Sequence, residues 1–161
     1  MRIVGIDPGL NATGYGVVDI DGDQSRHVAH GVVRTRSTDA LARRLVLIRD
    51  GLRVALAQWS PEQGAVEASF VGSNARTAMA LGHARAAAIL ALADSGLEVH
   101  EYAPTMIKQT VAGYGRGEKS QVAEMVRLQL GLATAPTPSD AADALAVAIT
   151  HWAHTRLAER L

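Results

Sequence analysis

The chain has 161 residues, no cysteine and a formal net charge of zero, with 16 basic and 16 acidic residues. Its length suits a single domain over 1–161 with one core, and the lack of cysteine excludes disulfides, thiolate catalysis and the common structural zinc sites. Zero net charge gives no general sign of a nucleic-acid partner, so such an interaction must rest on local charge. No apolar run approaches the ~20 residues of a membrane span. We therefore expect a cytoplasmic protein without a membrane partner.

The first third of the sequence predicts three antiparallel strands and a helix. Strand-like runs over 2–7, 13–20 and 26–35 are separated by turn residues, and Asp-Gly between β-branched runs is typical of a hairpin. Apolar residues at helical spacing then predict a helix over 39–59, which Pro61 ends.

The rest of the sequence alternates between strands and helices. This alternation after three hairpin strands predicts an α/β domain with a mixed five-stranded sheet flanked by helices, undivided by a linker or repeat. The expected elements are a strand over 64–68, a helix over 74–95, a strand over 97–102, a helix over 104–111, a glycine-rich loop over 113–117, a helix over 118–130 and a last helix from 139 to about 160.

Four carboxylates occupy positions where an acid is costly. Asp7 ends an apolar run, Glu67 interrupts another, and Asp140 and Asp143 open an alanine-rich segment. Because an unpaired buried charge costs several kcal/mol or stays protonated, these segments suggest one shared cation. Oxygen ligands without cysteine favour Mg²⁺ or Mn²⁺, and four carboxylates suit two ions ~3.5–4 Å apart.

Each acid also has an ordinary structural explanation. Asp140 fits a capping box over 137–140, with Pro138 at the first helical position. Asp7 could be a turn aspartate, and Glu67 could pair with an arginine. Asp143 is harder to explain in this way, because it leads into an apolar segment. The joint occurrence of all four acids at element ends favours the metal hypothesis.

Six motifs resemble, in order and spacing, those of the RuvC family of Holliday-junction resolvases. They are Asp7-Pro-Gly-x₄-Gly14-Tyr-Gly16, Glu67-Ala-Ser-Phe70, Leu81-Gly-x-Ala84-Arg85, Lys108-Gln-Thr-Val111, Gly117-Glu-Lys-Ser-Gln121 and Asp140-Ala-Ala-Asp-Ala-Leu-Ala146. The resemblance extends from residue 2 to about 152. It implies a ribonuclease-H-like fold, a homodimer, Mg²⁺ or substituting Mn²⁺, and paired symmetric nicks in four-way DNA junctions that leave 5′-phosphates. It also implies the RuvA and RuvB branch-migration proteins as partners.

The resemblance further assigns roles to individual residues. It places the catalytic and metal-binding acids at Asp7, Glu67, Asp140 and Asp143, and it makes Phe70 a wedge near the junction crossover. Stacking of an aromatic ring on an unpaired base is worth roughly 1–3 kcal/mol, although a core position for this ring is the structural alternative. The DNA-binding candidates are Phe70, Lys108, Lys119, Arg116, Arg76 and Arg85.

Two other features have mainly structural interpretations. His151 and His154 lie toward the end of the last predicted helix without a carboxylate motif, and we interpret them as structural. A stripe of apolar and small residues on the 74–95 helix suggests core packing, and the family resemblance adds a dimer interface. The stripe comprises Met79, Leu81, Ala84, Ala88 and Leu92.

Other functions remain possible from the sequence alone. The first loop, 7–14, also resembles a phosphate loop of actin-like phosphotransferases, but those folds need a second half that this chain lacks. A non-catalytic junction-binding protein, a purely structural metal site and a ribonuclease-H-like RNA-processing nuclease are further alternatives. Phe70 after Glu67 and the Asp-Ala-Ala-Asp helix start favour the junction enzyme.

Overall fold

A computed structural model describes residues 1–69, 74–113 and 118–159, with only the main chain for Lys119 and Glu159. The strands are β1 (Arg2–Asp7), β2 (Ala12–Asp21), β3 (Gln24–Arg34), β4 (Gln63–Glu67) and β5 (Val99–Tyr102). The helices are α1 (Leu41–Trp59), α2 (Ala75–Asp94), α3 (Pro104–Ala112), α4 (Lys119–Gln129) and α5 (Ser139–Glu159). Within these described segments, no helix combines the length and the apolar composition needed to cross a bilayer.

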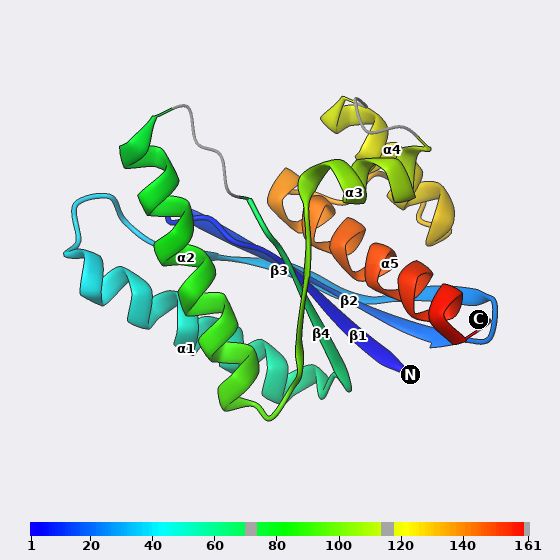
Figure 1. The fold of residues 1–161 in the computed structure, drawn as a ribbon, viewed down its shortest axis with the longest axis horizontal. Coiled ribbons are helices and arrows are strands. Elements are labelled where there is room, and N and C mark those ends of the chain that lie inside the picture. Colours follow the sequence, from blue (N-terminus) through cyan, green and yellow to red (C-terminus); the bar gives the residue numbers. More distant parts are fainter. Residues whose placement is uncertain (70–73, 114–117, 160–161) are drawn as a thin grey trace.

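The strands form one mixed sheet in the order β3-β2-β1-β4-β5, as Figure 1 shows. β1, β2 and β3 pair antiparallel, whereas β4 and β5 are parallel to β1. Gly22 turns the chain between β2 and β3 with a φ of 57°, a conformation that glycine adopts without a Cβ clash. The predicted α/β fold with a five-stranded mixed sheet is confirmed.

One expected boundary and one expected capping position differ for physical reasons. β5 begins at Val99 rather than at residue 97, because the Leu97 amide still donates to Leu92 O and completes the turn that ends α2. α5 begins at Ser139, so Pro138 precedes the helix instead of occupying its first position. The Pro138 carbonyl accepts hydrogen bonds from the amides of Ala141 and Ala142, which fixes the start of the helix.

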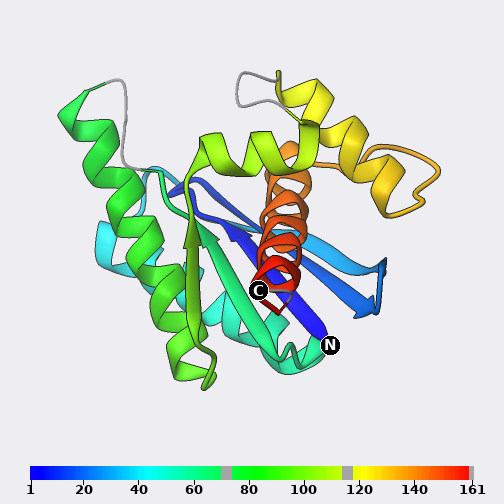
Figure 2. The same ribbon diagram turned by 45° about the vertical axis from the view of Figure 1, so that its right-hand side comes forward.

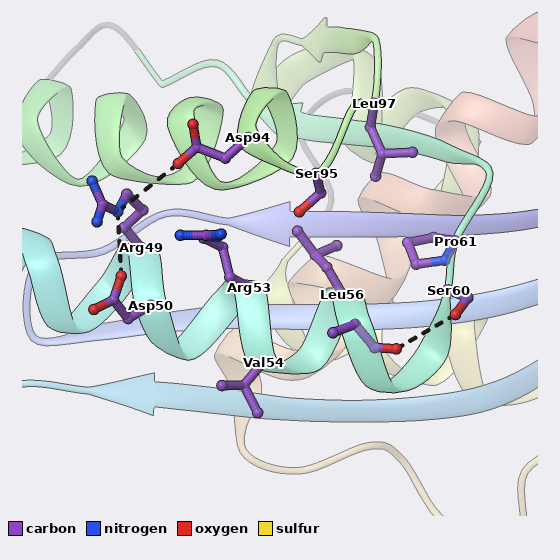
Figure 3. A pocket seen from close by; sticks show the side chains of 11 residues that line it. Arg49, Asp50, Arg53, Val54, Leu56, Ser60, Pro61, Asp94, Ser95 and Leu97 are labelled. Carbon is purple, nitrogen blue, oxygen red and sulfur yellow. Dashed lines mark hydrogen bonds and ion pairs between the residues drawn. The ribbon is translucent and has the colours of Figure 1, made fainter.

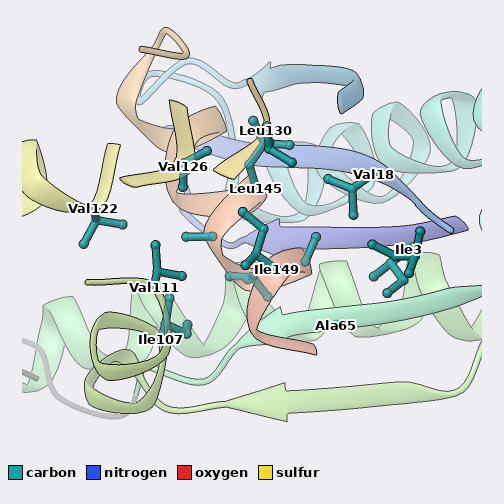
Figure 4. Close-up of a cluster of buried hydrophobic side chains, with 14 residues drawn as sticks. Ile3, Val18, Ala65, Ile107, Val111, Val122, Val126, Leu130, Leu145 and Ile149 are labelled. Carbon is teal, nitrogen blue, oxygen red and sulfur yellow. The ribbon is translucent and has the colours of Figure 1, made fainter. Parts of the chain in front are cut away.

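Helices cover both faces of the sheet, and each face has its own core. Figures 1 and 2 show α1 and α2 on one face and α5 on the other, with α3 and α4 beside α5. Leu52 and Leu92 belong to the first core, which joins α1 and α2 to the sheet. The second core, drawn in Figure 4, surrounds α5 and includes Ile3, Val18 and Leu145. The sheet thus separates the two cores, and α5 lies within the second one.

Glycines on β1 and β2 allow α5 to approach the sheet closely. A Cβ at Gly5 would lie 2.1 Å from the carbonyl oxygen of Ala144, and one at Gly14 would lie 2.0 Å from that of Asp140. A Cβ at Gly16 would meet the side chain of Leu145 at 2.6 Å. Since the first two contacts involve helix main chain, no side-chain rotation could relieve them. The absence of a Cβ at these positions therefore sets the distance between α5 and the sheet.

We expect Gly5→Ala to destabilise the protein by about 1–3 kcal/mol or more, because α5 must move to admit the methyl group. For a domain of this size, each kcal/mol lowers the melting temperature by about 2–4 °C. The matched control is Gly82→Ala on α2, where a Cβ would meet no atom within 4 Å. That change should be neutral or stabilising by about 0.5–1 kcal/mol, because alanine favours helix. A Gly5→Ala protein that melts at the wild-type temperature would contradict the close packing.

Candidate active site

Three separate elements bring carboxylates to one edge of the sheet. Asp7 is the last residue of β1 and Glu67 the last residue of β4. These strands are parallel neighbours, with Ile6 paired with Val66, so both acids lie at the carboxyl edge. Asp143, near the start of α5, lines with them a cavity of about 330 Å³. The structure thus joins three of the four predicted acids at the usual ligand-binding edge of an α/β sheet.

Asp140 lies at the same edge but does not line this cavity. Its main chain packs on Gly14, which is the strand partner of Asp7. Its side chain is half-buried in the first turn of α5, where the helix dipole favours an acid. The sequence hypothesis that Asp140 binds metal therefore stays a prediction, and a helix-capping role is also compatible with this position.

The carboxylates share a cavity without forming a ready-made ligand cluster. Among the described residues, no group of three or more His, Asp or Glu side chains is placed to hold an ion as it stands. Glu67 instead accepts a hydrogen bond from the Ser69 hydroxyl, with 3.0 Å between Oγ and Oε1. Ser69 also lines the cavity beside Asp7 and Glu67. A modest side-chain rotation would have to accompany metal binding.

Ser69 is a residue of the site that the sequence did not reveal. It lies within the motif Glu67-Ala-Ser-Phe70, but nothing in that motif indicated a role for it. The available signal was its position two residues after Glu67, which returns a side chain to the same side of an extended chain. The hydroxyl orients one carboxylate oxygen of Glu67, so Ser69 is a positioning residue of the site.

Arg85 of α2 lies in the wall of the acidic site. It borders a small recess together with Asp7, Glu67 and Ser69. Its guanidinium also forms an ion pair with Glu101, which is paired with Val66 on the neighbouring strand. A cation in this position offsets part of the negative charge near Glu67. The predicted contact between Arg85 and DNA stays a prediction, and the ion pair seen for this residue is with Glu101 of the same chain.

The other predicted DNA-binding residues differ in their placement. Lys108 of α3 is half-buried and lines the acidic cavity opposite the sheet edge. Arg76 is exposed in the first turn of α2. Lys119 is the first residue of α4, but its side chain lies outside the described part of the structure. Phe70 and Arg116 also lie outside the described residues, so their roles remain predictions.

A hydrogen-bonded group around His151 joins α5 to the strands that carry the site. His151 is fully buried; its Nδ1 lies 2.8 Å from the Tyr102 hydroxyl and its Nε2 lies 2.9 Å from Gln63 Oε1. With the Gln63 oxygen as acceptor, Nε2 carries the proton and Nδ1 accepts from Tyr102. Burial, together with the nearby His100 and His154, lowers the pKa of His151 to about 4. The ring is therefore neutral, which agrees with the structural interpretation of His151.

This group joins α5 to the start of β4, the strand that ends at Glu67, and to the end of β5. Gln63 begins β4 and Tyr102 ends β5, and the Tyr102 carbonyl accepts a hydrogen bond of 2.9 Å from the amide of Ala68. Ala68 directly follows Glu67. Burial also raises the pKa of Tyr102, so its hydroxyl stays protonated as a donor. One end of α5 therefore supplies Asp143, while a later turn anchors the helix to both parallel strands.

A larger cavity, of about 820 Å³, lies elsewhere in the molecule (Figure 3). It is an open hollow between the ends of α1 and α2. Its acids, Asp50 and Asp94, already lie 3.3 and 4.0 Å from the guanidinium of Arg49. The volume of a cavity therefore does not identify the reactive site. The candidate site is identified by the carboxylates that meet at the strand ends.

Comparisons with known proteins agree with this site. The profile described as "Crossover junction endodeoxyribonuclease RuvC" matches residues 3–151. A protein of that name from Chloroflexus aggregans is 50% identical over 151 residues, covering 94% of this chain and 92% of the relative. The structure of Thermus thermophilus RuvC has a TM-score of 0.89 and 37% identity, covering 98% of this chain and 97% of that one. The structure of T. thermophilus RuvC in complex with a Holliday junction substrate has a TM-score of 0.91 and 37% identity, covering 98% of this chain and 96% of that one.

The sheet order, the covering helices and the acidic edge define a ribonuclease-H-like nuclease domain. Its acids come from β1, β4 and α5, which are distant in the sequence. The chain belongs to the RuvC family of crossover junction endodeoxyribonucleases.

We expect His151 to make stability depend on pH below neutrality. The unfolded chain, with an ordinary histidine pKa of 6.5, binds a proton before the folded chain does. The free energy of unfolding should therefore fall as the pH drops from 6.5 toward 4, by about 3 kcal/mol in all from this group. Denaturant unfolding at about pH 7 and about pH 4.5 measures the loss.

The comparison protein is His151→Gln. For each protein, the free energy of unfolding at the lower pH is compared with its own value at the higher pH. This variant should be less stable at neutral pH, but should lose about 2–3 kcal/mol less on acidification because glutamine does not titrate. An equal loss in both proteins would contradict a buried neutral His151.

Proposed function

We propose that this chain resolves four-way DNA junctions by paired symmetric nicks that leave 5′-phosphates, in recombination and repair. The observation that carries the proposal is the convergence of Asp7, Glu67 and Asp143 with Lys108 around one cavity, in a chain of the RuvC family. An acidic site beside a cation suits hydrolysis of a phosphodiester, in which negative charge develops on phosphate oxygens. The junction bound by the Thermus thermophilus relative supports the choice of substrate.

The residues present fit Mg²⁺, or Mn²⁺ in its place, and we propose two ions per site. The cavity offers carboxylates and the Ser69 hydroxyl, and the chain has no thiolate, a donor set that hard divalent cations prefer. Asp7, Glu67, Asp143 and Asp140 would hold them. When bound, such ions lower the pKa of an attacking water and stabilise the departing oxygen.

The protein side chains contribute orientation and charge around this chemistry. The Ser69 hydroxyl donates to one oxygen of Glu67 and so orients this carboxylate at the rim of the cavity. Lys108 places a positive charge where the phosphate must lie. Arg85 places a second positive charge beside Asp7 and Glu67, in the wall of the neighbouring recess. These roles require the carboxylates to be charged, so the proposed activity depends on cations on both sides.

We also propose contacts with DNA outside the acidic cavity. Phe70 would act as the wedge at the junction crossover, because it follows Glu67 by three residues and an aromatic ring can stack on an unpaired base. Lys119 and Arg116, three residues apart in the sequence, would contact the phosphate backbone. Arg76 is exposed on the α2 side of the same sheet edge, which supports a similar role. Such contacts position the strand and carry no sequence information.

A homodimer is part of the proposal, and exposed apolar side chains on α1 and α2 support it. Val54 is 67% exposed on α1, and Met79 and Leu90 are 63% and 52% exposed on α2. The predicted small-residue stripe is divided, because Ala88 and Leu92 pack into the core of their own chain. The outward residues are therefore better candidates for the interface than the inward ones. A two-fold dimer would match the pseudo-symmetry of a four-way junction.

We also propose partner proteins and a cellular location that follow from the same substrate. RuvA and RuvB would act on the same junction before its resolution, and the cytoplasm is where chromosomal junctions would be met. Neither assignment changes the chemistry of the acidic cavity. The proposal therefore stands or falls on cleavage of the junction itself.

Replacing Asp7 with Asn should abolish nicking of a synthetic four-way junction, while junction binding persists. The amide preserves size but removes the charge that a divalent cation requires. Gel analysis of labelled strands, with and without Mg²⁺ and with linear duplex as the control, measures the effect. An active Asp7→Asn protein would overturn the metal assignment. Duplex or RNA cut as fast as the DNA junction would overturn the proposed substrate.

A further inference from the structure

The corner between β3 and α1 is tied to the segment that follows Asp7. The Thr35 amide donates to Asn11 O at 3.1 Å, and the Thr35 hydroxyl donates to Leu10 O at 2.6 Å. Thr35 and Leu10 are 25 residues apart in the sequence. The chain after β3 is therefore held in a fixed position relative to the end of β1.

A buried arginine reinforces this corner. Arg44, near the start of α1, is only 8% exposed. Its Nε donates to Thr35 Oγ1 at 2.8 Å and its Nη2 donates to Asn11 Oδ1 at 2.5 Å. Both partners are neutral, and within the described chain Arg44 forms no ion pair with a carboxylate. A buried guanidinium is costly, so its uncompensated charge is a feature that packing alone does not require.

The same corner exposes two further arginines. Arg34 ends β3 and Arg36 follows the fixed Thr35, and both side chains are exposed. Neither side chain has a hydrogen bond or ion pair to the described part of the chain. Residues 34–44 contain four arginines and one acid, Asp39, which lies 3.8 Å from Arg43. The corner is therefore strongly cationic in a protein whose net charge is zero.

Strand register places this cationic corner at the catalytic edge. Asp7 pairs with Gly14 of β2, and two residues further along the same pair of strands Ala12 pairs with Arg34. Two strand spacings and two residues correspond to roughly 12 Å between the Cα atoms of Asp7 and Arg34. Figure 1 shows the segment that joins β3 to α1 on the side of the sheet where β1 ends. Measured along the axis of a DNA duplex, roughly 12 Å corresponds to three or four nucleotides of one strand, at ~3.4 Å per nucleotide.

We propose that Arg34 and Arg36 bind backbone phosphates of the junction strand a few nucleotides from the cut, while Arg44 holds their corner in place. The inference rests on the proposed junction cleavage and extends the DNA-binding surface to the β3 side of the sheet, opposite Lys108. Guanidinium groups suit phosphate oxygens because they can donate two parallel hydrogen bonds. The bound strand would thus lie between cations on both flanks of the acids.

The test compares the double variant Arg34→Gln/Arg36→Gln with Arg53→Gln. Arg53 is an exposed arginine of the same helix layer, without an ion pair among the described residues, but it lines the hollow in Figure 3 at the other end of α1. Binding to an intact junction is measured in an Asp7→Asn background at several salt concentrations. Cleavage at saturating junction is measured with Asp7 present.

The double variant should bind the junction about tenfold more weakly, and the slope of log affinity against log salt should fall by about 2. Cleavage at saturating junction should stay at the wild-type rate, and Arg53→Gln should change neither quantity. A double variant with the affinity and slope of the control would overturn the inference. So would a slower cleavage at saturation with an unchanged slope, because that result places the arginines in catalysis. If the protein with Arg34 and Arg36 intact fails to bind junctions, the proposed function itself fails.

Discussion

The close contact between α5 and the glycines of β1 and β2 is the constraint on which the site depends. At Gly5 and Gly14 the helix main chain occupies the space where a Cβ would lie. This contact places the first turns of α5 beside the end of β1, and so brings Asp143 to the cavity that Asp7 and Glu67 line. A helix lifted by one methyl group would separate acids that must act on the same phosphate. Packing density in the core is therefore also a condition for the chemistry.

The two ends of α5 serve opposite purposes. Its start carries acids that repel the other carboxylates of the cavity, which opposes folding. Its middle turns are buried as far as His151, which connects them to Gln63 and Tyr102 on the parallel strands. The anchored, buried part of the helix thus offsets the repulsion between carboxylates at its start. Such a division is expected where a functional site is less stable than the scaffold that holds it.

Much of the fold could be predicted from the sequence because its signals are local. Alternation, helical spacing and turn residues predicted all five strands and the five helices, with small errors at element ends such as the start of β5. The acids could be predicted because a charge inside an apolar segment is anomalous wherever the segment lies. On α2 the predicted core packing is confirmed for Ala84, Ala88 and Leu92, whereas Met79 is exposed, because helical spacing alone does not show how far the covered side of a helix extends.

The features that the sequence did not reveal depend on contacts between distant segments. Arg44 bonds to Asn11, 33 residues earlier, and nothing in either local sequence indicates this partner. Arg34 gains significance only from the strand register that brings it to the edge of Asp7. Ser69 is adjacent to a predicted acid, but a serine at a strand end has many ordinary roles. Long-range geometry was needed to separate these residues from other polar side chains on the surface.

Anomalous diffraction from crystals soaked in Mn²⁺ would test most directly whether the packed sheet and helix create one metal-binding site. The account predicts manganese peaks in the cavity between Asp7, Glu67 and Asp143, with carboxylate oxygens within the ~2.0–2.2 Å typical of small divalent cations. Crystals that contain manganese only elsewhere, for example at Asp50 and Asp94 in the hollow between α1 and α2, would contradict it.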